Sequence, residues 1–490
     1  MRVPFWYRRA MTSLPREGRP HHAILDDLES LRQGDAKWRE GRVMSLVYDG
    51  GEAHQELLKQ AYSLYFSENG LNPMAFKSLR RMEADVVRIT AGLFHGGPDT
   101  VGTLTSGGTE SILLAVKAAR ERAHARGFRG KPELVVPKSA HVAFDKAAHY
   151  FGLRIRHVPL GDDFRVDLRE LRRAIGRNTV LVAASAPQYP HGVIDPIGAI
   201  AEVTRERGVP FHVDACIGGF VLPWLERLGE AIPPWDFRVD GVTSISADLH
   251  KYGYAAKGAS VLLYRDMSYL KHQFFIATDW PGGIYASPSM PGTRPGGAIA
   301  AAWAALQGLG EAGYLDLTRR TLTAKQKLVV GVRNIPELRV LGVPQSTIVA
   351  FTSNDPSIDI YAVADAMEDR GWSVDRQQHP SSMHATLMAK HADVIDTYLE
   401  DLRAAVAEVR ADPSRKSRGN AAMYGMMAKV PFRGMVRKGV EGVMEAMYGP
   451  GNGEIDLSKS NDGPLVAKLK ELAPRALDAL DALKSRFGRR

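Results

Sequence analysis

The chain has 490 residues, a net charge of +9 and 44% hydrophobic residues, a composition typical of a globular protein large enough for more than one domain. Its single cysteine, Cys216, excludes an intrachain disulfide and suits a reducing compartment, so we expect a cytoplasmic protein. No apolar run approaches the roughly 18–20 residues of a spanning helix, and the N-terminus lacks the apolar core of a secretory signal. The modest positive charge favours anionic ligands, and we expect neither a nucleic-acid partner nor a metal.

Residues 1–60 are expected to form an N-terminal arm. Its first residues combine aromatic side chains with arginines, from Phe5 to Arg9. They fit a transient contact with a membrane surface or an ordinary packed arm. Two amphipathic helices are predicted next, from His54 to Phe66 and from Phe76 to Leu93, because apolar residues recur there at helical spacing.

Short apolar runs alternate with helical patterns between residues 61 and 312, the expected large domain. The strand-like runs are Gly102 to Thr105, Leu134 to Val136, Arg154 to Val158, Val180 to Ala184, Phe211 to Val213, Val242 to Ile245 and Ser260 to Tyr264. This alternation predicts an α/β fold with a mostly parallel central sheet that is covered by helices on both faces. Such sheets bind ligands at the carboxyl ends of their strands.

The rest of the chain divides into two further parts. Residues 313–411 combine a long helix, Tyr314 to Val332, with short strands, and are expected to form a smaller C-terminal α+β domain. Residues 412–490 are expected to form a tail, basic at first and ending in an amphipathic helix from Leu465 to Phe487.

The segment SADLHKYGYAAKG, which follows a predicted strand, contains two lysines, Lys251 and Lys257. Lys251 stands between His250 and Tyr252. A lysine at the end of a buried strand suits Schiff-base chemistry, because burial and nearby cations lower its pKa and free the amine to attack a carbonyl. The alternative is a solvated loop lysine.

The segment TSGGTESI lies between a predicted strand and a predicted helix. Glycines let the backbone approach an anion, and the start of a helix offers free N–H groups. Ser106, Gly107, Gly108 and Thr109 are therefore candidates for a phosphate cradle. The alternative is a helix start capped by Thr109.

Two further segments place chemical groups at strand ends. Asp214 ends a predicted buried strand in HVDACIGGF, where it suits a protonated pyridine nitrogen or a structural salt bridge to an arginine. Cys216 has no evident flanking base and is expected to be inert. His141 opens a helix, where it suits stacking on a flat ring, a cap or a place in the core.

Two loops complete the set of candidate segments. APQYPHGVIDP has Tyr189 and His191 at its tip. The long stretch from Thr278 to Gly297 is rich in glycine and proline and centres on Thr293 and Arg294. A loop of this length in a compact domain is more often functional than idle.

Taken together from about Tyr48 to Tyr424, these segments resemble the sphingosine-1-phosphate lyases of the soluble bacterial type. These are pyridoxal-phosphate enzymes of the aspartate-aminotransferase fold (fold type I), in the group II decarboxylase-like branch. The specific features are HVDACIGGF, the second lysine six residues after the first, and the Gly-Thr-Arg loop. The resemblance implies pyridoxal 5'-phosphate as the cofactor and a phosphorylated long-chain base as the substrate.

The resemblance also implies a role for individual residues. Lys251 would hold the cofactor as a Schiff base, Asp214 would pair with its pyridinium nitrogen, and His141 would stack on its ring. Gly108 and Thr109 would hold its phosphate, with His250 close by. Thr293, a serine in most members, and Arg294 lie on a loop that the partner subunit supplies, which implies a homodimer with shared active sites.

The remaining matched positions are linked to the substrate or its phosphate in the family. They are Lys257, Tyr48, Tyr189 and Tyr424. Asn72 stands where many members have a histidine, and it can neither carry a charge nor move a proton.

The implied reaction is a retro-aldol cleavage that yields a long-chain aldehyde and phosphoethanolamine, with a general base that the sequence does not identify. One alternative is an amino-acid decarboxylase in which Arg294 binds the substrate carboxylate. Another is a non-catalytic scaffold that binds membranes or proteins.

Overall fold

The computed structural model describes residues 13–429 and 433–449 and groups the chain into two compact units. The larger unit consists of Met44–Phe351 and His384–Leu399, and the second consists of Met1–Val43, Thr352–Met383 and Glu400–Arg490. The interpretations of residues 5–9 and of a last helix over residues 465–487 fall outside the described ranges. The four-part domain division stays a prediction.

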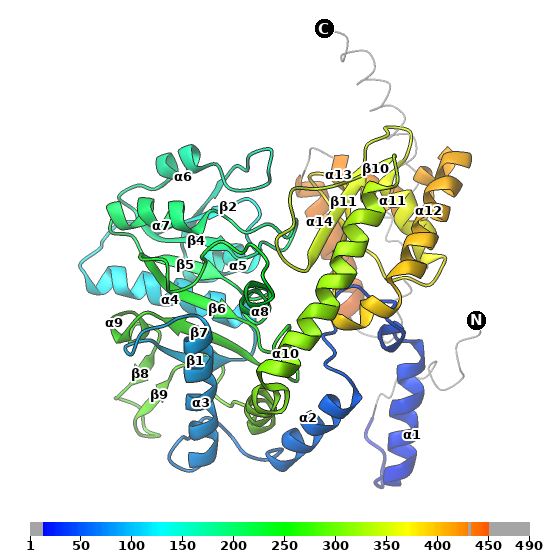
Figure 1. Cartoon of the computed structure of the whole chain (residues 1–490). Coiled ribbons are helices and arrows are strands. Elements are labelled where there is room, and N and C mark those ends of the chain that lie inside the picture. Colours follow the sequence, from blue (N-terminus) through cyan, green and yellow to red (C-terminus); the bar gives the residue numbers. More distant parts are fainter. Residues whose placement is uncertain (1–12, 430–432, 450–490) are drawn as a thin grey trace. The chain divides into compact units, whose positions relative to one another are not determined.

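A seven-stranded sheet with the order β1-β7-β6-β5-β4-β2-β3 forms the centre of the larger unit (Figure 1). Its strands are β1 (Val101–Thr105), β2 (Glu133–Pro137), β3 (Arg154–Val158), β4 (Thr179–Ser185), β5 (Phe211–Asp214), β6 (Val242–Ala247) and β7 (Ser260–Tyr264). From β3 to β6 neighbouring strands are parallel, whereas β7 runs antiparallel to both β6 and β1. The predicted α/β class with a mostly parallel sheet is confirmed.

Helices cover both faces of this sheet, and alternate residues of one strand face different helices. On β2, Leu134 and Val136 share a core cluster with α4 (Gly108–Ala125) and α5 (Ala143–Phe151). Val135 between them belongs to the cluster that includes α6 (Leu168–Ala174) and α7 (Ile197–Glu206). Burial on both faces explains why the centre of β2 is a continuous apolar run rather than an alternating one.

The strand directions bring the candidate segments to one edge of the sheet. β1 and β6 are both antiparallel to β7, so β1 runs in the same direction as the parallel strands. The carboxyl ends of β1, β2, β4, β5 and β6 therefore lie along the same edge. At these five strand ends, or on the segments that follow them, stand in turn Gly108, His141, Tyr189, Asp214 and Lys251.

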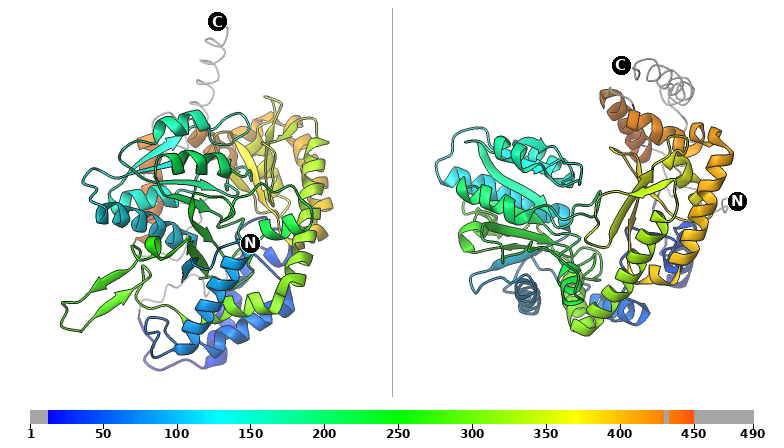
Figure 2. Two further views of the ribbon diagram at one scale, coloured as in Figure 1. Left: turned by 60° about the vertical axis from the view of Figure 1, so that its left-hand side comes forward. Right: turned by 45° about the horizontal axis from the view of Figure 1, so that its top comes forward.

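Other elements of the larger unit surround the sheet. They are α2 (Glu52–Leu64), α3 (Lys77–Leu93), α8 (Leu222–Arg227), α9 (Met267–Leu270), α10 (Gly296–Arg333), β10 (Leu338–Val340), η4 (Ala389–Asp393) and the hairpin β8 (Phe275–Ala277) with β9 (Tyr285–Ser287). The helix expected over residues 314–332 is the second part of α10, which bends at Gly310 (φ 55°, ψ −176°). The hairpin, which was not predicted, extends away from the central sheet (Figure 2, left).

The second unit contains helices and part of a smaller sheet. Its elements are α1 (His21–Leu31), η2 (Arg32–Gly34), η3 (Trp38–Glu40), α11 (Ile360–Glu368), β12 (Asp375–Gln377), η5 (Pro413–Ser417), α13 (Gly419–Lys429) and α14 (Arg433–Tyr448). The boundary between the units falls inside β11 (Ile348–Ser353), β13 (Ser382–Thr386) and α12 (Ile395–Ala411). The basic stretch of the expected tail is helical over α13 and α14. In the described ranges, no helix has the length and apolar character needed to cross a membrane.

Candidate active site

A cavity of about 550 Å³ opens at the carboxyl edge of the large sheet. Its lining comes from the segments that follow β1, β2, β4, β5 and β6, from residues 45–48 ahead of α2, and from Thr386. The candidate residues in this lining are Tyr48, Gly108, Thr109, His141, Tyr189, Asp214, His250, Lys251 and Lys257. Residues far apart in the sequence, such as Tyr48 and Lys257, thus meet in one cavity.

Lys251 lies on the turn that follows β6. Its Nζ is 2.9 Å from Oδ2 of Asp248, and the two residues are also joined by a backbone hydrogen bond from Lys251 N to Asp248 O (3.2 Å). The expectation that nearby cations lower the pKa of Lys251 is wrong. Burial lowers this pKa, but the charge of Asp248, smaller contributions from Cys216 and Tyr48, and the hydrogen bond to Asp248 together raise it above the ordinary lysine value.

Asp214 ends β5 and is 7% exposed. Its Oδ1 accepts hydrogen bonds from the backbone N of Cys216 (3.0 Å) and from Oγ of Ser246 (3.4 Å). Among the described residues, no arginine forms an ion pair with it. His212, two residues earlier, lies between Ser244 and Ser246, and burial lowers its pKa to about 4, so it is neutral. Asp214 therefore supplies its charge to the cavity.

Cys216 also lines the cavity but is chemically quiet. The thiol is 7% exposed and donates a hydrogen bond to Oγ of Ser246 (3.3 Å). Burial and the charge of Asp214 raise its pKa well above the usual value, so the reactive thiolate is disfavoured.

The glycine-rich segment leads from β1 into α4, which begins at Gly108 with Gly107 as its N-cap. No side chain caps this helix start, so the alternative in which Thr109 acts as the cap is wrong. A Cβ at position 108 would lie 2.7 Å from Sγ of Cys216 and 2.8 Å from Oδ2 of Asp248, too close for any other residue. The N–H groups of the first helical turn lack intrahelical partners, so this end of α4 can bind an anion.

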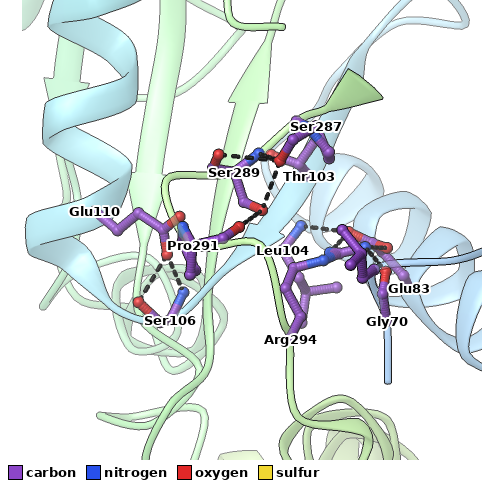
Figure 3. Close-up of polar contacts among 12 residues, drawn as sticks. Gly70, Glu83, Thr103, Leu104, Ser106, Glu110, Ser287, Ser289, Pro291 and Arg294 are labelled. Atoms are coloured by element: carbon purple, nitrogen blue, oxygen red, sulfur yellow. Dashed lines mark hydrogen bonds and ion pairs between the residues drawn. The ribbon is translucent and has the colours of Figure 1, made fainter. Parts of the chain in front are cut away.

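Glu110 holds Ser106, the first residue of the predicted cradle. Its Oε2 accepts hydrogen bonds from both N (2.6 Å) and Oγ (2.7 Å) of Ser106. Its Oε1 accepts a third, from the backbone N of Met290 (2.8 Å) on the loop between β9 and α10. Ser106 therefore shapes the cradle through Glu110, and the same carboxylate attaches that loop (Figure 3).

His141 lies just ahead of α5 with an exposed side chain. Its Nδ1 accepts a hydrogen bond from the backbone N of Ala143 (3.1 Å), which fixes the orientation of the ring. The imidazole lines the cavity. It is therefore neither a core group nor the N-cap residue of α5, which is Val142.

Lys257 and Tyr48 lie together in another part of the lining. Lys257 Nζ donates hydrogen bonds to the carbonyl oxygens of Leu46 (2.8 Å) and His250 (3.2 Å) and lies 5.2 Å from the centre of the Tyr48 ring. Burial, and then the charge of Lys251, lower the pKa of Lys257. Two lysine ammonium groups thus share one cavity, and among the described residues Asp248 is the carboxylate that forms an ion pair with one of them, Lys251.

Tyr189 is held by a histidine that the sequence did not single out. The rings of Tyr189 and His384 are 4.3 Å apart, and Nε2 of His384 is 3.0 Å from the backbone oxygen of Tyr189. Burial lowers the pKa of His384 to about 4, so the ring is neutral. His384 lies far away in the sequence, and no local pattern marks it.

Three predicted residues of the larger unit do not line this cavity. Nη1 and Nη2 of Arg294 bind both oxygens of Glu83 (2.7 and 3.1 Å), and Nη2 also donates to the carbonyl of Gly70 (2.9 Å; Figure 3). Thr293 accepts a hydrogen bond from the Asn69 side chain (3.3 Å). Oδ1 of Asn72 accepts from N of Met74 (3.0 Å) and N of Ala75 (3.1 Å) in an exposed turn. In this chain these residues shape a loop and a turn.

Tyr424 belongs to the second unit. Its ring lies 5.8 Å from that of Tyr361 and 5.5 Å from the guanidinium of Arg376. Arg376 in turn forms ion pairs with Asp365 and Glu368 of α11. The position of α13, which carries Tyr424, is thus fixed within its own unit.

A family model, related sequences and solved structures all indicate the same family for this chain. The pyridoxal-dependent decarboxylase conserved domain matches residues 8–354. Sphingosine-1-phosphate lyase 1 of Rattus norvegicus is 45% identical over 439 residues, which is 89% of this chain and 77% of the rat protein. The structure of a sphingosine-1-phosphate lyase from Burkholderia pseudomallei superposes with a TM-score of 0.82 at 40% identity, covering 90% of this chain and 97% of that one. A glutamate decarboxylase from Lactobacillus brevis shares the fold at 20% identity, with a TM-score of 0.72 over 82% of this chain and 96% of that one.

Proposed function

Because the chain belongs to the sphingosine-1-phosphate lyase family, among the proteins with a pyridoxal-dependent decarboxylase domain, we propose that it cleaves a phosphorylated long-chain base. The products are a long-chain aldehyde and phosphoethanolamine. The observation that carries this proposal is the cavity itself, where Lys251, Asp214, His141 and the start of α4 come together with a second lysine, Lys257.

The residues of the cavity fit pyridoxal 5'-phosphate, the cofactor of this family. Lys251 offers an amine inside the cavity, and Asp214 offers a buried carboxylate with no arginine partner among the described residues. At Gly108 the backbone is open to an anion at a point where a side chain would collide with Cys216 and Asp248. When bound, this cofactor supplies an electron sink for breaking a bond next to the substrate amine.

Each residue then has a defined task. The backbone N–H groups of Gly108 and Thr109 bind the cofactor phosphate at the positive end of α4. Asp214 stabilises a proton on the ring nitrogen, and the fixed imidazole of His141 orients the ring. Lys251 is the attachment point, and its Nζ carries a proton whenever the amine is free.

The substrate phosphate binds near Lys257 in this proposal. Its ammonium group is held by two neutral carbonyl oxygens, so its positive charge stays available for an anion. Tyr48 lies under the ammonium group and Tyr189 forms another part of the same lining. Their hydroxyl groups are suited to donate to the substrate.

The decarboxylase alternative needs a cation for the substrate carboxylate, and Arg294 was the candidate. The bidentate pair with Glu83 and the absence of Arg294 from the cavity lining do not favour that role for the chain itself. The scaffold alternative rested on the aromatic N-terminus, outside the described residues, and on the basic tail. It does not account for the set of residues around Lys251.

Product analysis tests the proposed reaction. The purified full-length protein is incubated with a phosphorylated long-chain base, and separately with common amino acids. We expect aldehyde and phosphoethanolamine in equal amounts from the first and no carbon dioxide from the second, with no products from the Lys251→Ala variant. Carbon dioxide without aldehyde would instead establish a decarboxylase.

We also propose that the protein works as a homodimer in the cytoplasm. Thr293 does not line the cavity of its own subunit. This supports a role for the loop that carries Thr293 in the active site of a partner subunit. The single cysteine supports a reducing compartment. A transient membrane contact through residues 5–9 is tested by cosedimentation with anionic vesicles, where loss of binding on deletion of residues 1–12 is the supporting result.

A further inference from the structure

Asp248 is a buried carboxylate that sequence reasoning left without a role. It follows directly after β6, is 2% exposed, and precedes Lys251 by three residues. Its backbone is fixed on both sides, because Asp248 N donates to Cys216 O (3.3 Å) and Asp248 O accepts from Lys251 N (3.2 Å). The turn therefore holds the two residues within reach of each other, and Oδ2 of Asp248 lies 2.9 Å from Lys251 Nζ.

The surroundings of this carboxylate leave Lys251 as its main counter-charge. Oδ1 has no hydrogen-bond partner among the described residues, and Nε2 of His250 is 3.6 Å from Oδ2. The start of α4 packs against it, since a Cβ on Gly108 would lie within 2.9 Å of both carboxylate oxygens. A buried carboxylate with one oxygen unpaired is costly unless a nearby cation compensates its charge.

We propose that Asp248 is the proton partner of Lys251: it holds the free amine as an ammonium ion and accepts its proton when the nitrogen bonds to a carbonyl carbon. The inference rests on the proposed function only for the role of Lys251 as the attachment point. A nitrogen attacks a carbonyl through its lone pair, so the ammonium group must first give up one proton, which Asp248 accepts. The new bond between nitrogen and carbon then replaces the C=O bond, whose oxygen leaves as water with the two remaining protons of the neutral amine.

This proton transfer balances within the pair. Moving the proton from Nζ to Oδ2 turns an ammonium ion and a carboxylate into a neutral amine and a neutral carboxylic acid. The total charge of the pair is zero before and after, so no net charge enters the buried site. When the amine is released, the same proton returns to Nζ over the same 2.9 Å contact.

Other titratable groups line the same cavity as Asp248 and Lys251. They are Tyr48, Glu110, His141, Tyr189, Asp214 and Cys216 from other segments, with His250 and Lys257 on the same segment. Burial lowers the pKa of Lys251 and the charge of Asp248 raises it, while the charge of Lys251 in turn lowers the pKa of Lys257. Without the charge of Asp248, burial and the neighbouring ammonium group of Lys257 would together favour the neutral amine of Lys251.

The test measures the protonation of Lys251 directly, without substrate and without catalysis. The full-length protein is freed of cofactor and labelled briefly with acetic anhydride across a pH series, and the labelled lysines are quantified by mass spectrometry. The midpoint of labelling against pH reports the pKa of an amine whatever its accessibility. Lys59, whose side chain is 70% exposed, is the internal reference in every sample.

In the wild-type protein, the labelling midpoint of Lys251 should lie above that of Lys59. In Asp248→Asn, which keeps the shape and removes the charge, it should fall by about one pH unit or more. Asp236→Asn is the matched control, because Asp236 is equally buried in ion pairs with His95 and Arg238 but does not line the cavity. Its Lys251 midpoint should equal that of the wild type.

A wild-type midpoint for Lys251 at or below that of Lys59 overturns the proposal, even if the Asp248 variant does not fold. An Asp248→Asn protein that folds and keeps the wild-type midpoint overturns it as well. Neither result depends on lyase activity, so the failure of this inference and the failure of the proposed function are separate observations.

Discussion

Lys257 carries the positive charge that this account assigns to the substrate phosphate. The carbonyl oxygens of Leu46 and His250 fix its ammonium group without neutralising it. Replacing Lys257 by Met keeps the length of the side chain and removes the charge. We expect KM for the phosphorylated base to rise about tenfold or more with a smaller change in kcat, whereas Lys59→Met leaves both unchanged.

The same residue predicts a pH dependence. Burial and the charge of Lys251 lower the pKa of Lys257, so it loses its proton at a lower pH than an exposed lysine. A neutral amine binds phosphate weakly, so KM in the wild-type enzyme should rise as the pH passes upward through that lowered pKa. A KM profile of Lys257→Met with the same rise would contradict this assignment.

At Gly108, close packing leaves no room for a side chain beside the site proposed for the cofactor phosphate. A Cβ there would meet Sγ of Cys216 at 2.7 Å and both oxygens of Asp248 within 2.9 Å, and these two side chains are themselves buried. We expect Gly108→Ala to cost about 1–3 kcal/mol of stability and to weaken cofactor binding at least about tenfold. Fluorescence titration with pyridoxal phosphate measures the affinity.

Gly92→Ala is the control for that substitution. Gly92 lies near the end of α3, and a Cβ there meets nothing within 4 Å. Alanine favours a helix over glycine by about 1 kcal/mol, so this variant should be as stable as the wild type or more stable. Equal cofactor affinity in the two variants would show that the close approach at Gly108 is unimportant.

At the scale of elements, one carboxylate ties the helix start that binds phosphate to the loop between β9 and α10. Glu110 accepts from Ser106 on one side and from Met290 on the other, and it is 6% exposed. We expect Glu110→Ala to weaken cofactor binding about tenfold and to speed proteolysis within residues 278–297. Glu121→Ala on the outer part of α4 should do neither, and a protected loop in Glu110→Ala would refute the coupling.

How far the sequence predicts these elements depends on whether the cause is local. The runs that became β2 and β4 are mostly apolar, and β5 and β6 are short runs of apolar residues interrupted by His, Thr and Ser. Together with the helical patterns between them, these runs are sufficient to locate buried parallel strands. The hairpin β8–β9 has mostly exposed residues, and the bend at Gly310 interrupts an otherwise helical pattern, so neither leaves a clear local signal.

The site residues, too, could be predicted only where the signal in the sequence is local. Gly108, Asp214 and Lys251 stand at strand ends and could be picked out from short motifs. Arg294 could not be placed, because its partner Glu83 lies 211 residues away in the sequence. The direction of the Lys251 pKa shift was wrong because Asp248, although only three residues away, was not recognised as its partner.

At the scale of the whole molecule, the proposed dimer predicts that two inactive variants can form a mixed dimer with one intact active site. Lys251→Ala removes the attachment point, and Thr293→Asp places a repelling carboxylate on the loop. If Thr293 serves the partner's cavity, a mixed dimer has one site with both residues intact. Random pairing of equal amounts should restore about a quarter of the wild-type activity.

Each variant alone should stay inactive in that experiment, and native mass spectrometry verifies that mixed dimers form. Mixed dimers without recovered activity would indicate that Thr293 acts in the active site of its own subunit. A protein that is fully active as a monomer in gel filtration would contradict the shared site altogether.

Reduction of the cofactor-loaded protein with borohydride tests the central claim most directly, because it makes any bond between pyridoxal phosphate and a lysine permanent. Peptide mass spectrometry then identifies the modified residue. The account predicts the adduct on Lys251, with none in Lys251→Ala and none on Lys257 in the wild type. An adduct on another lysine, or no adduct in a protein that still cleaves a phosphorylated long-chain base, would contradict it.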